Sequence, residues 1–509
     1  MPSDANAAGV LPRPQHCAPV SISGLARLSG ADPPDVDVEV TGITASSKHI
    51  RQGDLFAALP GRSGHGARFA DRAMDEGAVA VLTDPAGRAL VDARTPMLVV
   101  PDVRACLGEV AAAVYGSPSN TLAIAGVTGT SGKTTTTYLV RAGLRAAHRA
   151  CGLIGTVATL IGDDAVATGF TTPEAPEIQA LLAVMSERGV RDVAMEVSSH
   201  ALAMGRADAI AFDVAAFTNL SQDHLDFHTD MDEYFAAKAR LFDGRASIAV
   251  VMIDDDWGRR LAAQIGPAAL TVSAEGDTAA AWRALDARAT PDGRTAFQVV
   301  GPDGHVQAGS AIPGRYNVAN ALLAIAILSQ LGVAPDLAAD AVAGATVPGR
   351  MERVEAGQPF MAIVDYSHKP AAIAGALAAL RPLTAGRLIV VLGCGGDRDR
   401  AKRSAMGAIA ARGSDLLIIT DDNPRSEDPG SIRAAMLGGA LALSMAERGQ
   451  VREIGDRAEA ISAAVTAAEP GDTVLVAGKG HEQGQEINGV TVPFDDRDAL
   501  RAALRSMRR

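Results

Sequence analysis

Cysteine is scarce in this chain, and its few cysteines form no recognisable pattern. Only four occur in 509 residues, namely Cys17, Cys106, Cys151 and Cys394, and none of them has CxxC spacing. Scattered cysteines argue against a disulfide framework, because disulfide-stabilised domains are dense in cysteine. We therefore expect free thiols in a reducing compartment.

Long apolar runs and an excess of positive charge are also missing. The longest apolar helical run, residues 320–333, is shorter than the roughly 20 residues that a membrane-spanning helix needs. Residues 1–17 lack the basic start and the apolar core of a secretory signal. The net charge of -12 gives no general attraction to nucleic acid or to acidic membranes. These absences predict a cytoplasmic protein with no membrane insertion and no nucleic-acid partner.

Aromatic residues make up only 4% of the chain, whereas alanine and glycine are abundant and 48% of the residues are hydrophobic. This composition is typical of a compact enzyme built from helices and sheets, and it argues against wide disorder. Because 509 residues exceed one ordinary core, the length predicts several domains.

Three zones differ in the pattern of their apolar runs, and they predict an α/β fold with three domains. Residues 1–118 contain short apolar strands between glycine-rich turns. Residues 119–346 contain continuous apolar runs, which are buried on both faces of a mainly parallel sheet. In residues 347–509, apolar strands alternate with alanine-rich helices, the βαβ pattern of a Rossmann-like domain.

A glycine-rich turn, followed by one lysine and four threonines, stands near the start of the central zone. Residues 121–127 are predicted to form a buried strand and Lys133 to begin a helix, so the turn between them is an anion site at a helix N-terminus. Lys133 is placed to contact the β- and γ-phosphates of a nucleotide, and Thr134 to offer its hydroxyl to Mg²⁺. Val127 occupies the position of the first glycine in a strict phosphate-binding loop, so this loop is a variant; an ordinary tight turn is the alternative. The predicted ATP-binding residues of this segment are Gly129, Thr130, Ser131, Gly132, Lys133, Thr134 and Thr135.

Ten motifs, of which this turn is the first, follow one another along the chain. They read GVTGTSGKTTTT, TTPEA, MEVSSHAL, FTNLSQDHLDFH, YFAAKARLF, VPGRMERV, VDYSHKPAAI, GCGGDRDRAKR, DDNPR and GKGHE. Together they resemble the Mur ligase family, ATP-dependent enzymes that extend the peptide of the bacterial cell-wall precursor. The resemblance covers nearly the whole chain and is weakest in residues 1–40, which are similar to a variable extension. The motifs are most similar to those of the members that add meso-diaminopimelate to UDP-N-acetylmuramoyl-L-alanyl-D-glutamate.

The resemblance implies a defined chemistry. In this family, ATP phosphorylates the D-glutamyl side-chain carboxylate, and an incoming amine attacks the acyl phosphate to form an amide. It therefore implies ATP and Mg²⁺ as cofactors, and the muramoyl dipeptide and meso-diaminopimelate as substrates. Such a site must hold three reactants within attack distance and neutralise their crowded negative charge. We expect the chain to act as a monomer with three domains, the first binding UDP-muramoyl, the second ATP and the third the amino acid.

Four residues are predicted to carry the catalysis, namely Lys133, Glu196, His224 and Lys238. Glu196 ends an apolar strand, where a parallel sheet presents its ligands and where a carboxylate suits Mg²⁺. The resemblance implies that His224 helps to hold a second Mg²⁺ and that Lys238 is carbamylated, since a carbamate supplies an anionic oxygen ligand. The predicted metal ligands are therefore Thr134, Glu196, His224 and the carbamate of Lys238.

Two other patterns could suggest metal sites. His224 and His228 are four residues apart, a spacing by which a helix can present two zinc ligands. Leu225 stands where a zinc protease has its glutamate, so we expect His228 to pack or to form hydrogen bonds instead. The acidic run at residues 253–257 is predicted to be a strand-to-helix turn.

The resemblance also assigns residues to the muramoyl dipeptide and to ATP. The residues that it assigns to the UDP-muramoyl dipeptide are Ser47, Thr171, Thr172, Ser198, Met204 and Arg206. The turn at residues 61–66 is similar to a further contact with the UDP part. Met204 and Phe170 depart from the commoner residues at their positions, which are glutamine and a polar residue. The residues that it assigns to ATP outside the glycine turn are Asn317, Arg350, Asp365 and His368.

The box Asp422–Arg425 follows an apolar strand and, by the resemblance, accompanies diaminopimelate. Diaminopimelate has a second carboxylate that lysine lacks, and the guanidinium of Arg425 can hold it by paired hydrogen bonds. The predicted diaminopimelate-binding residues are Arg398, Asp422, Asn423, Pro424, Arg425, Gly478 and Glu482.

Three other functions compete with this prediction. A regulatory ATPase or GTPase would share the glycine turn but would hydrolyse its nucleotide without an amine. Folylpolyglutamate synthase shares the turn and the modified lysine, but the N-terminal zone and the DDNPR box disfavour it. A Mur ligase that adds lysine is disfavoured by Arg425.

Overall fold

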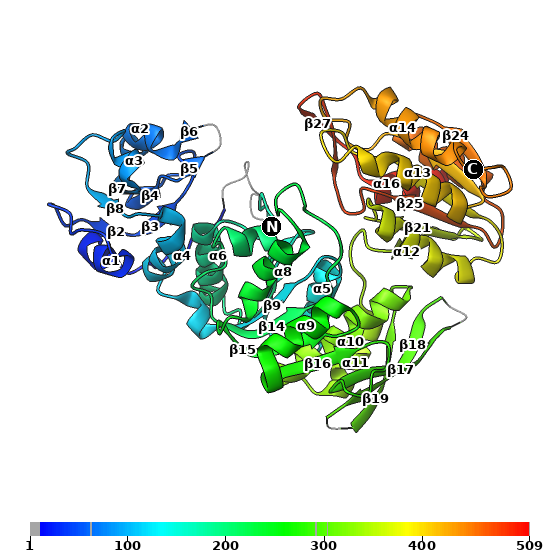
Figure 1. Cartoon of the computed structure of the whole chain (residues 1–509), viewed down its shortest axis with the longest axis horizontal. Coiled ribbons are helices and arrows are strands. Elements are labelled where there is room, and N and C mark those ends of the chain that lie inside the picture. The colour runs from blue at the N-terminus through cyan, green and yellow to red at the C-terminus, as the bar shows by residue number, and fades with distance from the viewer. Residues whose placement is uncertain (1–10, 62–63, 291–292, 303, 508–509) are drawn as a thin grey trace. The chain divides into compact units, whose positions relative to one another are not determined.

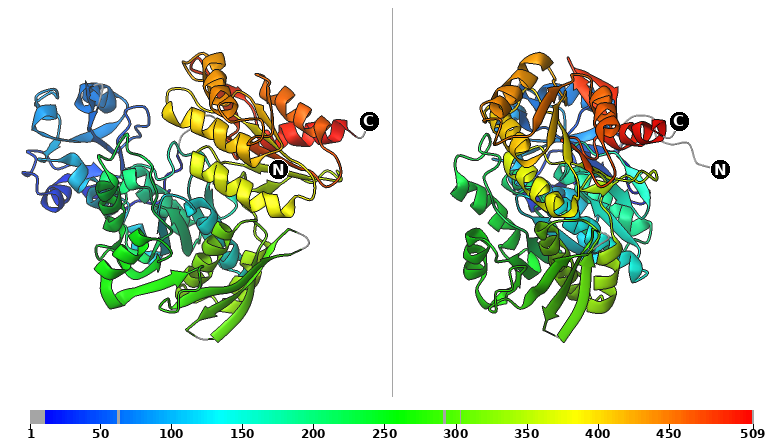
Figure 2. Two further views of the ribbon diagram at one scale, coloured as in Figure 1. Left: turned by 45° about the vertical axis from the view of Figure 1, so that its right-hand side comes forward. Right: turned by 90° about the vertical axis from the view of Figure 1, so that its right-hand side faces the viewer.

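The structure is a computed structural model that describes residues 11–61, 64–290, 293–302 and 304–507 (Figure 1, Figure 2). It consists of two compact units. The first comprises residues 1–285, 299–306 and 322–342, and the second comprises residues 286–298, 307–321 and 343–509. Each unit is described by itself.

The N-terminal part of the first unit is built on a small sheet with the strand order β3-β4-β7-β8. All three pairings are parallel, and apolar residues of helices α1, α4 and α6 pack into one core with the strands. The bounds are β3 Gly42–Thr44, β4 Asp54–Ala57, β7 Ala78–Thr83, β8 Met97–Val99, α1 Ile22–Ser29, α2 Ala70–Asp75, α3 Pro85–Arg88, α4 Val103–Val114 and α6 Ala175–Glu187.

The segment before α1 contacts both parts of the first unit. The guanidinium of Arg13 pairs with the buried carboxylate of Asp54 and donates a hydrogen bond to the His49 carbonyl (3.1 Å). The backbone N–H groups of Gln15 and His16 donate to the two carboxylate oxygens of Glu187 on α6 (2.9 and 2.8 Å). The described part of the predicted N-terminal extension is therefore tied to the folded unit.

The centre of the first unit is part of an 11-stranded sheet in which β12-β11-β10-β13-β9-β14-β15-β16 are neighbours in that order. All pairings from β10 to β16 in this order are parallel, whereas β11 pairs antiparallel with both β10 and β12. The bounds are β9 Ala123–Thr128, β10 Cys151–Ile154, β11 Thr159–Ile161, β12 Asp164–Val166, β13 Asp192–Glu196, β14 Phe212–Phe217, β15 Ala246–Met252, β16 Ala269–Ser273, β17 Trp282–Ala289, β18 Thr295–Gly301 and β19 Gly304–Ser310. Residues of β9, β13 and β14 are almost entirely buried, which confirms the prediction from their continuous apolar runs.

Helices connect and cover these strands, as the parallel pairing requires. Their bounds are α5 Lys133–Ala146, α7 Ser199–Ala203, α8 Met231–Ala239, α9 Asp256–Ile265, α10 Arg315–Gln330 and α11 Pro335–Gly344. The acidic run at residues 253–257 forms the predicted strand-to-helix turn, because β15 ends at Met252 and Asp255 caps α9 by accepting a hydrogen bond from Gly258 N–H (2.6 Å).

The C-terminal part of the second unit is a six-stranded sheet with the order β20-β21-β25-β22-β23-β24. Only β20 is antiparallel to its neighbour, and helices α12 to α16 alternate with the strands, as the βαβ pattern predicts. The bounds are β20 Glu352–Arg353, β21 Met361–Asp365, β22 Leu388–Leu392, β23 Leu416–Ile419, β24 Gln450–Glu453, β25 Thr473–Ala477, α12 Pro370–Leu380, α13 Ala401–Gly413, α14 Pro429–Leu441, α15 Arg457–Ala467 and α16 Asp496–Ser506. Strands β26 (Gly484–Ile487) and β27 (Val490–Pro493) form a separate hairpin.

In both sheets, the loops that follow adjacent parallel strands lie together at one edge. In the first unit, β13, β9 and β14 are adjacent and parallel, so the loops after these strands meet at one edge of the sheet. In the second unit, β21, β25, β22 and β23 are adjacent and parallel, so the loops after them also meet at one edge. Most of the predicted site residues follow one of these strands.

Two predictions from composition can be compared with the described residues. All four cysteines are free thiols, as expected from their spacing. In the described part of the chain, no helix has both the length and the apolar character needed to cross a membrane.

Candidate active site

A turn of four residues, Gly129–Gly132, lies between the end of β9 and the start of α5, and we call it the phosphate turn. Gly129 has φ 142° and Gly132 has φ 90°, conformations that other residues rarely adopt. A Cβ atom on Gly129 would also lie 1.9 Å from the hydroxyl of Thr218. Helix α5 begins directly after this turn, and the first N–H groups of a helix lack partners within the helix, so its N-terminus attracts anions.

Two lysines meet at the phosphate turn. The ammonium of Lys133 donates to the carbonyl oxygens of Gly129 (2.9 Å) and Thr130 (3.0 Å). Lys238, on α8, is 1% exposed, and its ammonium donates to the same Gly129 oxygen (2.7 Å). The Lys238 Nζ atom also lies 4.5 Å from the centre of the Tyr234 ring. The side chains of two lysines therefore converge on one turn.

A buried carboxylate faces this turn from the neighbouring strand. Glu196 ends β13 and is 1% exposed, and its Oε2 accepts a hydrogen bond from the Thr134 hydroxyl (3.0 Å). Thr156 donates its backbone N–H to Oε1 (2.8 Å) and its hydroxyl to Oε2 (3.0 Å). A Cβ atom on Gly155 would lie 2.4 Å from Oε1, so the carboxylate needs this glycine. A carboxylate flanked by hydroxyls offers the oxygen ligands that Mg²⁺ prefers.

The predicted third metal ligand, His224, lies in the loop before α8. Its backbone has φ 52°, its side chain is 43% exposed, and its Nε2 lies 3.2 Å from the Asp223 carboxylate. Its ring packs edge-on against the His200 ring at 4.8 Å between centres. In the part of the chain that the structure describes, no three His, Cys, Asp or Glu side chains form a metal-binding group. At the phosphate turn, the oxygen atoms closest to a possible cation site are the Glu196 carboxylate and the Thr134 hydroxyl that donates to it.

The second histidine of the pair, His228, packs among aromatic rings. Its side chain is fully buried, and its ring centre lies 4.8 Å from that of Phe227 and 5.1 Å from that of Tyr234. Burial lowers the pKa of His228 and raises the pKa of Tyr234. The neutral Tyr234 hydroxyl lies 3.2 Å from the Thr130 hydroxyl, which links this cluster to the phosphate turn.

The residues predicted for the muramoyl dipeptide gather beside Glu196, with one exception. The Thr172 hydroxyl donates to the Glu196 carbonyl (2.9 Å) and accepts from Ser198 N–H (3.1 Å). Arg206 donates to the Thr172 carbonyl (3.2 Å), pairs with Glu174 (3.0 Å) and touches the Met204 sulfur (3.4 Å).

Two other residues complete this region. The Thr171 hydroxyl lies 2.9 Å from the Thr156 hydroxyl, and Phe170 is 55% exposed with its ring centre 4.7 Å from the Arg206 guanidinium. Ser47 is the exception, since it lies in the loop between β3 and β4 and is not brought into this cluster. In the predicted turn 61–66, Arg62 and Ser63 lie outside the described residues.

In the second unit, three of the predicted ATP residues lie around the end of β21. Asp365 is buried and accepts hydrogen bonds from the N–H groups of Met351 (2.8 Å) and Ser367 (2.9 Å). The guanidinium of Arg350 lies 4.1 Å from the Tyr366 ring centre. Burial lowers the pKa of His368 to about 4, and its Nδ1 lies 2.8 Å from the Tyr366 carbonyl. Asn317 is placed on α10 instead, where it donates to the Pro313 carbonyl (2.7 Å).

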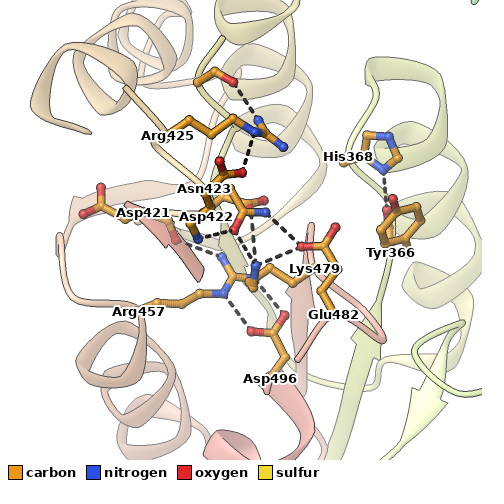
Figure 3. A network of polar contacts seen from close by, with 12 residues as sticks. Tyr366, His368, Asp421, Asp422, Asn423, Arg425, Arg457, Lys479, Glu482 and Asp496 are labelled. Atoms are coloured by element: carbon orange, nitrogen blue, oxygen red, sulfur yellow. Dashed lines mark hydrogen bonds and ion pairs between the residues drawn. The ribbon is translucent and has the colours of Figure 1, made fainter. Parts of the chain in front are cut away.

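Six of the seven predicted diaminopimelate residues, all except Arg398, lie on two loops, residues 421–425 and 478–482, which we call the amino-acid loops (Figure 3). Asn423 donates its side-chain amide to Glu482 Oε2 (2.9 Å), which joins the two loops. Gly478 has φ 120°, and a Cβ atom there would lie 2.8 Å from the Asp422 carboxylate. The neighbouring loop after β22 packs closely on this site, because a Cβ atom on Gly396 would lie 1.9 Å from the Pro424 carbonyl. Arg398, on the same loop, is exposed.

The guanidinium of Arg425 is already oriented in this structure. Its Nε donates to Glu486 Oε2 (3.1 Å), and its Nη1 donates to the Gly396 carbonyl (2.6 Å). The backbone of Arg425 has φ 52° and forms two hydrogen bonds with the β26–β27 hairpin. The Arg425 N–H donates to the Glu486 carbonyl (3.0 Å), and the Asn488 N–H donates to the Arg425 carbonyl (2.7 Å). The hairpin therefore fixes the residue that is predicted to select the amino acid.

Four residues that sequence reasoning missed help to build these sites. They are Thr156, Lys479, Glu486 and the buried Arg457, which pairs with Asp496. Lys479 lies inside the GKGHE motif, so the motif could have indicated it as a site residue, although its contacts depend on the fold. No sequence pattern indicates Arg457 or Glu486 as site residues, because their partners Asp496 and Arg425 are 39 and 61 residues away in the chain.

A phosphate turn after a parallel strand, with a buried carboxylate on the next strand, defines a nucleotide-binding α/β protein of the P-loop type. Comparison with known families is more specific. The chain matches the Mur ligase family, catalytic domain, at residues 39–115, the Mur ligase middle domain at residues 127–328 and the Mur ligase, glutamate ligase domain at residues 349–480.

Named relatives match over nearly their whole length. The UDP-N-acetylmuramoyl-L-alanyl-D-glutamate–2,6-diaminopimelate ligase of Streptomyces avermitilis is 54% identical over 97% of this chain and 98% of its own. The enzyme of the same name from Corynebacterium efficiens is 50% identical over 97% of both chains. A solved structure of a ligase with this name has a TM-score of 0.69 and 32% identity, and the match covers 97% of this chain and 100% of that one. The chain therefore belongs to the Mur ligase family and has its three-domain α/β fold.

Proposed function

We propose that this chain is an ATP-dependent ligase that joins meso-2,6-diaminopimelate to the D-glutamate side-chain carboxylate of UDP-N-acetylmuramoyl-L-alanyl-D-glutamate, with release of ADP and phosphate. The observation that carries the proposal is the near-complete match, at 54% identity, to a relative named for these two substrates. The geometry supports it, because one site is prepared for phosphate and another presents an arginine beside a carboxylate.

We assign one task to each of the three predicted domains. Residues 1–118 bind the UDP-muramoyl part, residues 119–346 bind ATP, and residues 347–509 bind the amino acid. In the central domain, Lys133 and the N-terminus of α5 hold the phosphates, because the lysine side chain and the start of the helix lie at the same turn. Ser47 would contact the UDP part from the first domain. Asn317, Arg350, Asp365 and His368 would contact the nucleotide from the remaining segments.

The oxygen atoms around the phosphate turn fit Mg²⁺. Glu196 and Thr134 would hold it, and Lys238 would join them as a carbamate, since its Nζ is already at the turn. His224 would help to hold a second Mg²⁺. When bound, Mg²⁺ neutralises the charge on the phosphates and on the reacting carboxylate. Lys133 and the helix N-terminus act on the same charge from the side of the protein.

Different residues would bind the two substrates that are joined, the UDP-muramoyl dipeptide and diaminopimelate. The dipeptide would be held beside Glu196 by Arg206 and by the hydroxyls of Thr171, Thr172 and Ser198. The reacting carboxylate of the dipeptide would then lie near the phosphate turn. Arg425 would hold the second carboxylate of diaminopimelate by paired hydrogen bonds, which lysine as a substrate cannot use. Holding both partners in attack geometry supplies much of the rate.

We also place the enzyme in the cytoplasm as a monomer that supplies peptidoglycan precursors, a placement supported by its free thiols. The function is tested by mass analysis of the product. Purified protein with ATP, Mg²⁺, the UDP-muramoyl dipeptide and meso-diaminopimelate should form the UDP-muramoyl tripeptide. The same mixture with L-lysine should form far less product. Equal product with both amino acids, or none with either, would contradict the proposal.

A further inference from the structure

Lys479 is a completely buried lysine at the centre of the amino-acid loops (Figure 3). It follows β25 and has 0% exposure, whereas lysine side chains are almost never fully buried unless they are paired. Its ammonium donates to Glu482 Oε2 (2.9 Å) and to Asn423 Oδ1 (3.0 Å), and lies 3.6 Å from Asp422 Oδ1. Its three partners come from both amino-acid loops, so one ammonium joins the two.

The contacts of Lys479 determine which way the Asn423 amide points. The Asn423 Oδ1 accepts from Lys479 and from the Glu486 N–H (3.0 Å), so this end of the amide must be the oxygen. The Nδ2 end then faces Glu482 Oε2 at 2.9 Å. Without the ammonium, one of the two donors that hold this orientation is lost.

The same contacts orient the Glu482 carboxylate. Both hydrogen bonds from the protein, from Lys479 and from Asn423, converge on Oε2. The Glu482 side chain keeps 32% exposure, so the carboxylate is held at one oxygen while part of the side chain remains accessible. A carboxylate held in this way is prepared to accept a hydrogen bond from an ammonium group of an amino acid.

We propose that Lys479 is a positioning residue for the amino-acid substrate, acting through Glu482 and Asn423. It holds the two amino-acid loops together and turns Glu482 toward the ammonium of diaminopimelate, while its charge offsets the two adjacent carboxylates. This inference rests on the proposed function, because it names the substrate that the site receives. A lysine that served stability alone would affect the three substrates equally.

The test is the steady-state kinetics of the full chain with each of the three substrates varied in turn. Lys479→Met should raise the KM for meso-diaminopimelate by about tenfold or more, since two charge-assisted hydrogen bonds are lost. The KM values for ATP and for the UDP-muramoyl dipeptide should stay within about twofold of wild type. Because Lys479 acts through Glu482, the double variant Lys479→Met/Glu482→Gln should be no worse than the more impaired single variant.

The same strand offers a matched control. Asp472 precedes β25, is 4% exposed and pairs with Arg387 (2.8 Å), so it is a buried charge at the opposite end of the strand from Lys479. Asp472→Asn should lower the melting temperature and leave the KM for diaminopimelate unchanged. If Lys479→Met does not yield folded protein, Lys479→Gln, which keeps one N–H donor but no charge, is measured in the same scheme.

Two results would overturn the inference. One is a diaminopimelate KM within twofold of wild type in the Lys479 variant, or an equal rise in all three KM values. The other is a double variant whose defect is the product of the two single defects, because Lys479 would then act independently of Glu482. A wild-type enzyme that forms no product with diaminopimelate would instead refute the proposed function, before any variant is compared.

Discussion

The phosphate turn of the first unit and the amino-acid loops of the second unit both place lysines at the carboxyl ends of parallel strands, but they hold these lysines differently. At the phosphate turn, the ammonium groups of Lys133 and Lys238 donate to the Gly129 carbonyl. At the amino-acid loops, Lys479 lies against the carboxylates of Glu482 and Asp422.

This difference follows from the ligands that the two sites are proposed to receive. Phosphate oxygens are strongly negative, so a turn that receives them needs a cation held by neutral carbonyls, which is the role proposed for Lys133. An amino acid brings both ammonium and carboxylate groups, so its site needs fixed charges of both signs at close quarters. The second site supplies them as Glu482 and Arg425, each held in place by a charged neighbour of opposite sign.

The largest effect is expected at the phosphate turn. Lys133→Met should lower kcat by at least about 100-fold, because it removes a cation that stabilises the transferring phosphoryl group. Arg145→Met is the matched control on the same helix, since Arg145 is half exposed and pairs with the exposed Asp163. Near-normal turnover of Lys133→Met in a phosphate-release assay would remove the phosphate turn from the mechanism.

Lys238 differs from both Lys133 and Lys479, because it is proposed to act as a carbamate rather than as a cation. Lys238→Ala should lose most of its activity, roughly 100-fold, and added formate or acetate should restore part of it by supplying the missing anionic oxygen. Lys238→Glu should also retain more activity than Lys238→Ala. Normal turnover of the alanine variant, measured without added acid, would exclude the carbamate.

A smaller and more selective effect is expected at the amino-acid loops. Arg425→Lys should raise the KM for diaminopimelate by about tenfold and leave the KM for ATP unchanged, because lysine cannot form the paired hydrogen bonds. Arg381→Lys is the control and should leave both KM values unchanged, since Arg381 is 43% exposed and pairs with Asp415 (2.7 Å), which is not part of the amino-acid loops. Equal changes in both KM values of the Arg425→Lys variant would argue against the carboxylate clamp.

The smallest effect is a pH dependence at His368. Its pKa of about 4 means that the folded protein binds fewer protons at this histidine than the unfolded chain does between pH 4 and 6.5. The stability that His368 contributes should therefore be complete above pH 6.5 and decrease as the pH falls through this window. Denaturant unfolding of wild type and His368→Gln at several pH values measures it, and a difference that stays constant from pH 7 to 4.5 would show that the pKa is not lowered.

The local parts of the first site could be predicted from the sequence, since they depend on short stretches of chain. Gly129–Gly132 form a turn between a strand and a helix because an apolar run ends just before them and the glycines at both ends of the turn can adopt a positive φ. The departure at Val127 is explained by the fold, because Val127 lies within β9, paired with Glu196, and the turn begins only at Gly129. The position of Glu196 at the end of a strand could be predicted, because the apolar run before it marks where the strand ends.

The second site could be predicted less completely, because its geometry depends on contacts between distant segments. The DDNPR and GKGHE motifs named Arg425 and Glu482, but Arg425 is held by Glu486 of a hairpin 61 residues away. The burial of Lys479 likewise results from the packing of two loops 56 residues apart. No periodicity or spacing predicts such pairs, which depend on how the strands are ordered in the sheet.

The most direct test of the account is the rate of phosphate release when one joining partner is left out. The account predicts rapid release with ATP, the UDP-muramoyl dipeptide and meso-diaminopimelate together, and release near background when either partner is absent, because the phosphoryl group moves to the dipeptide and leaves only when the amine attacks. Release at the full rate without the dipeptide or without diaminopimelate would contradict it.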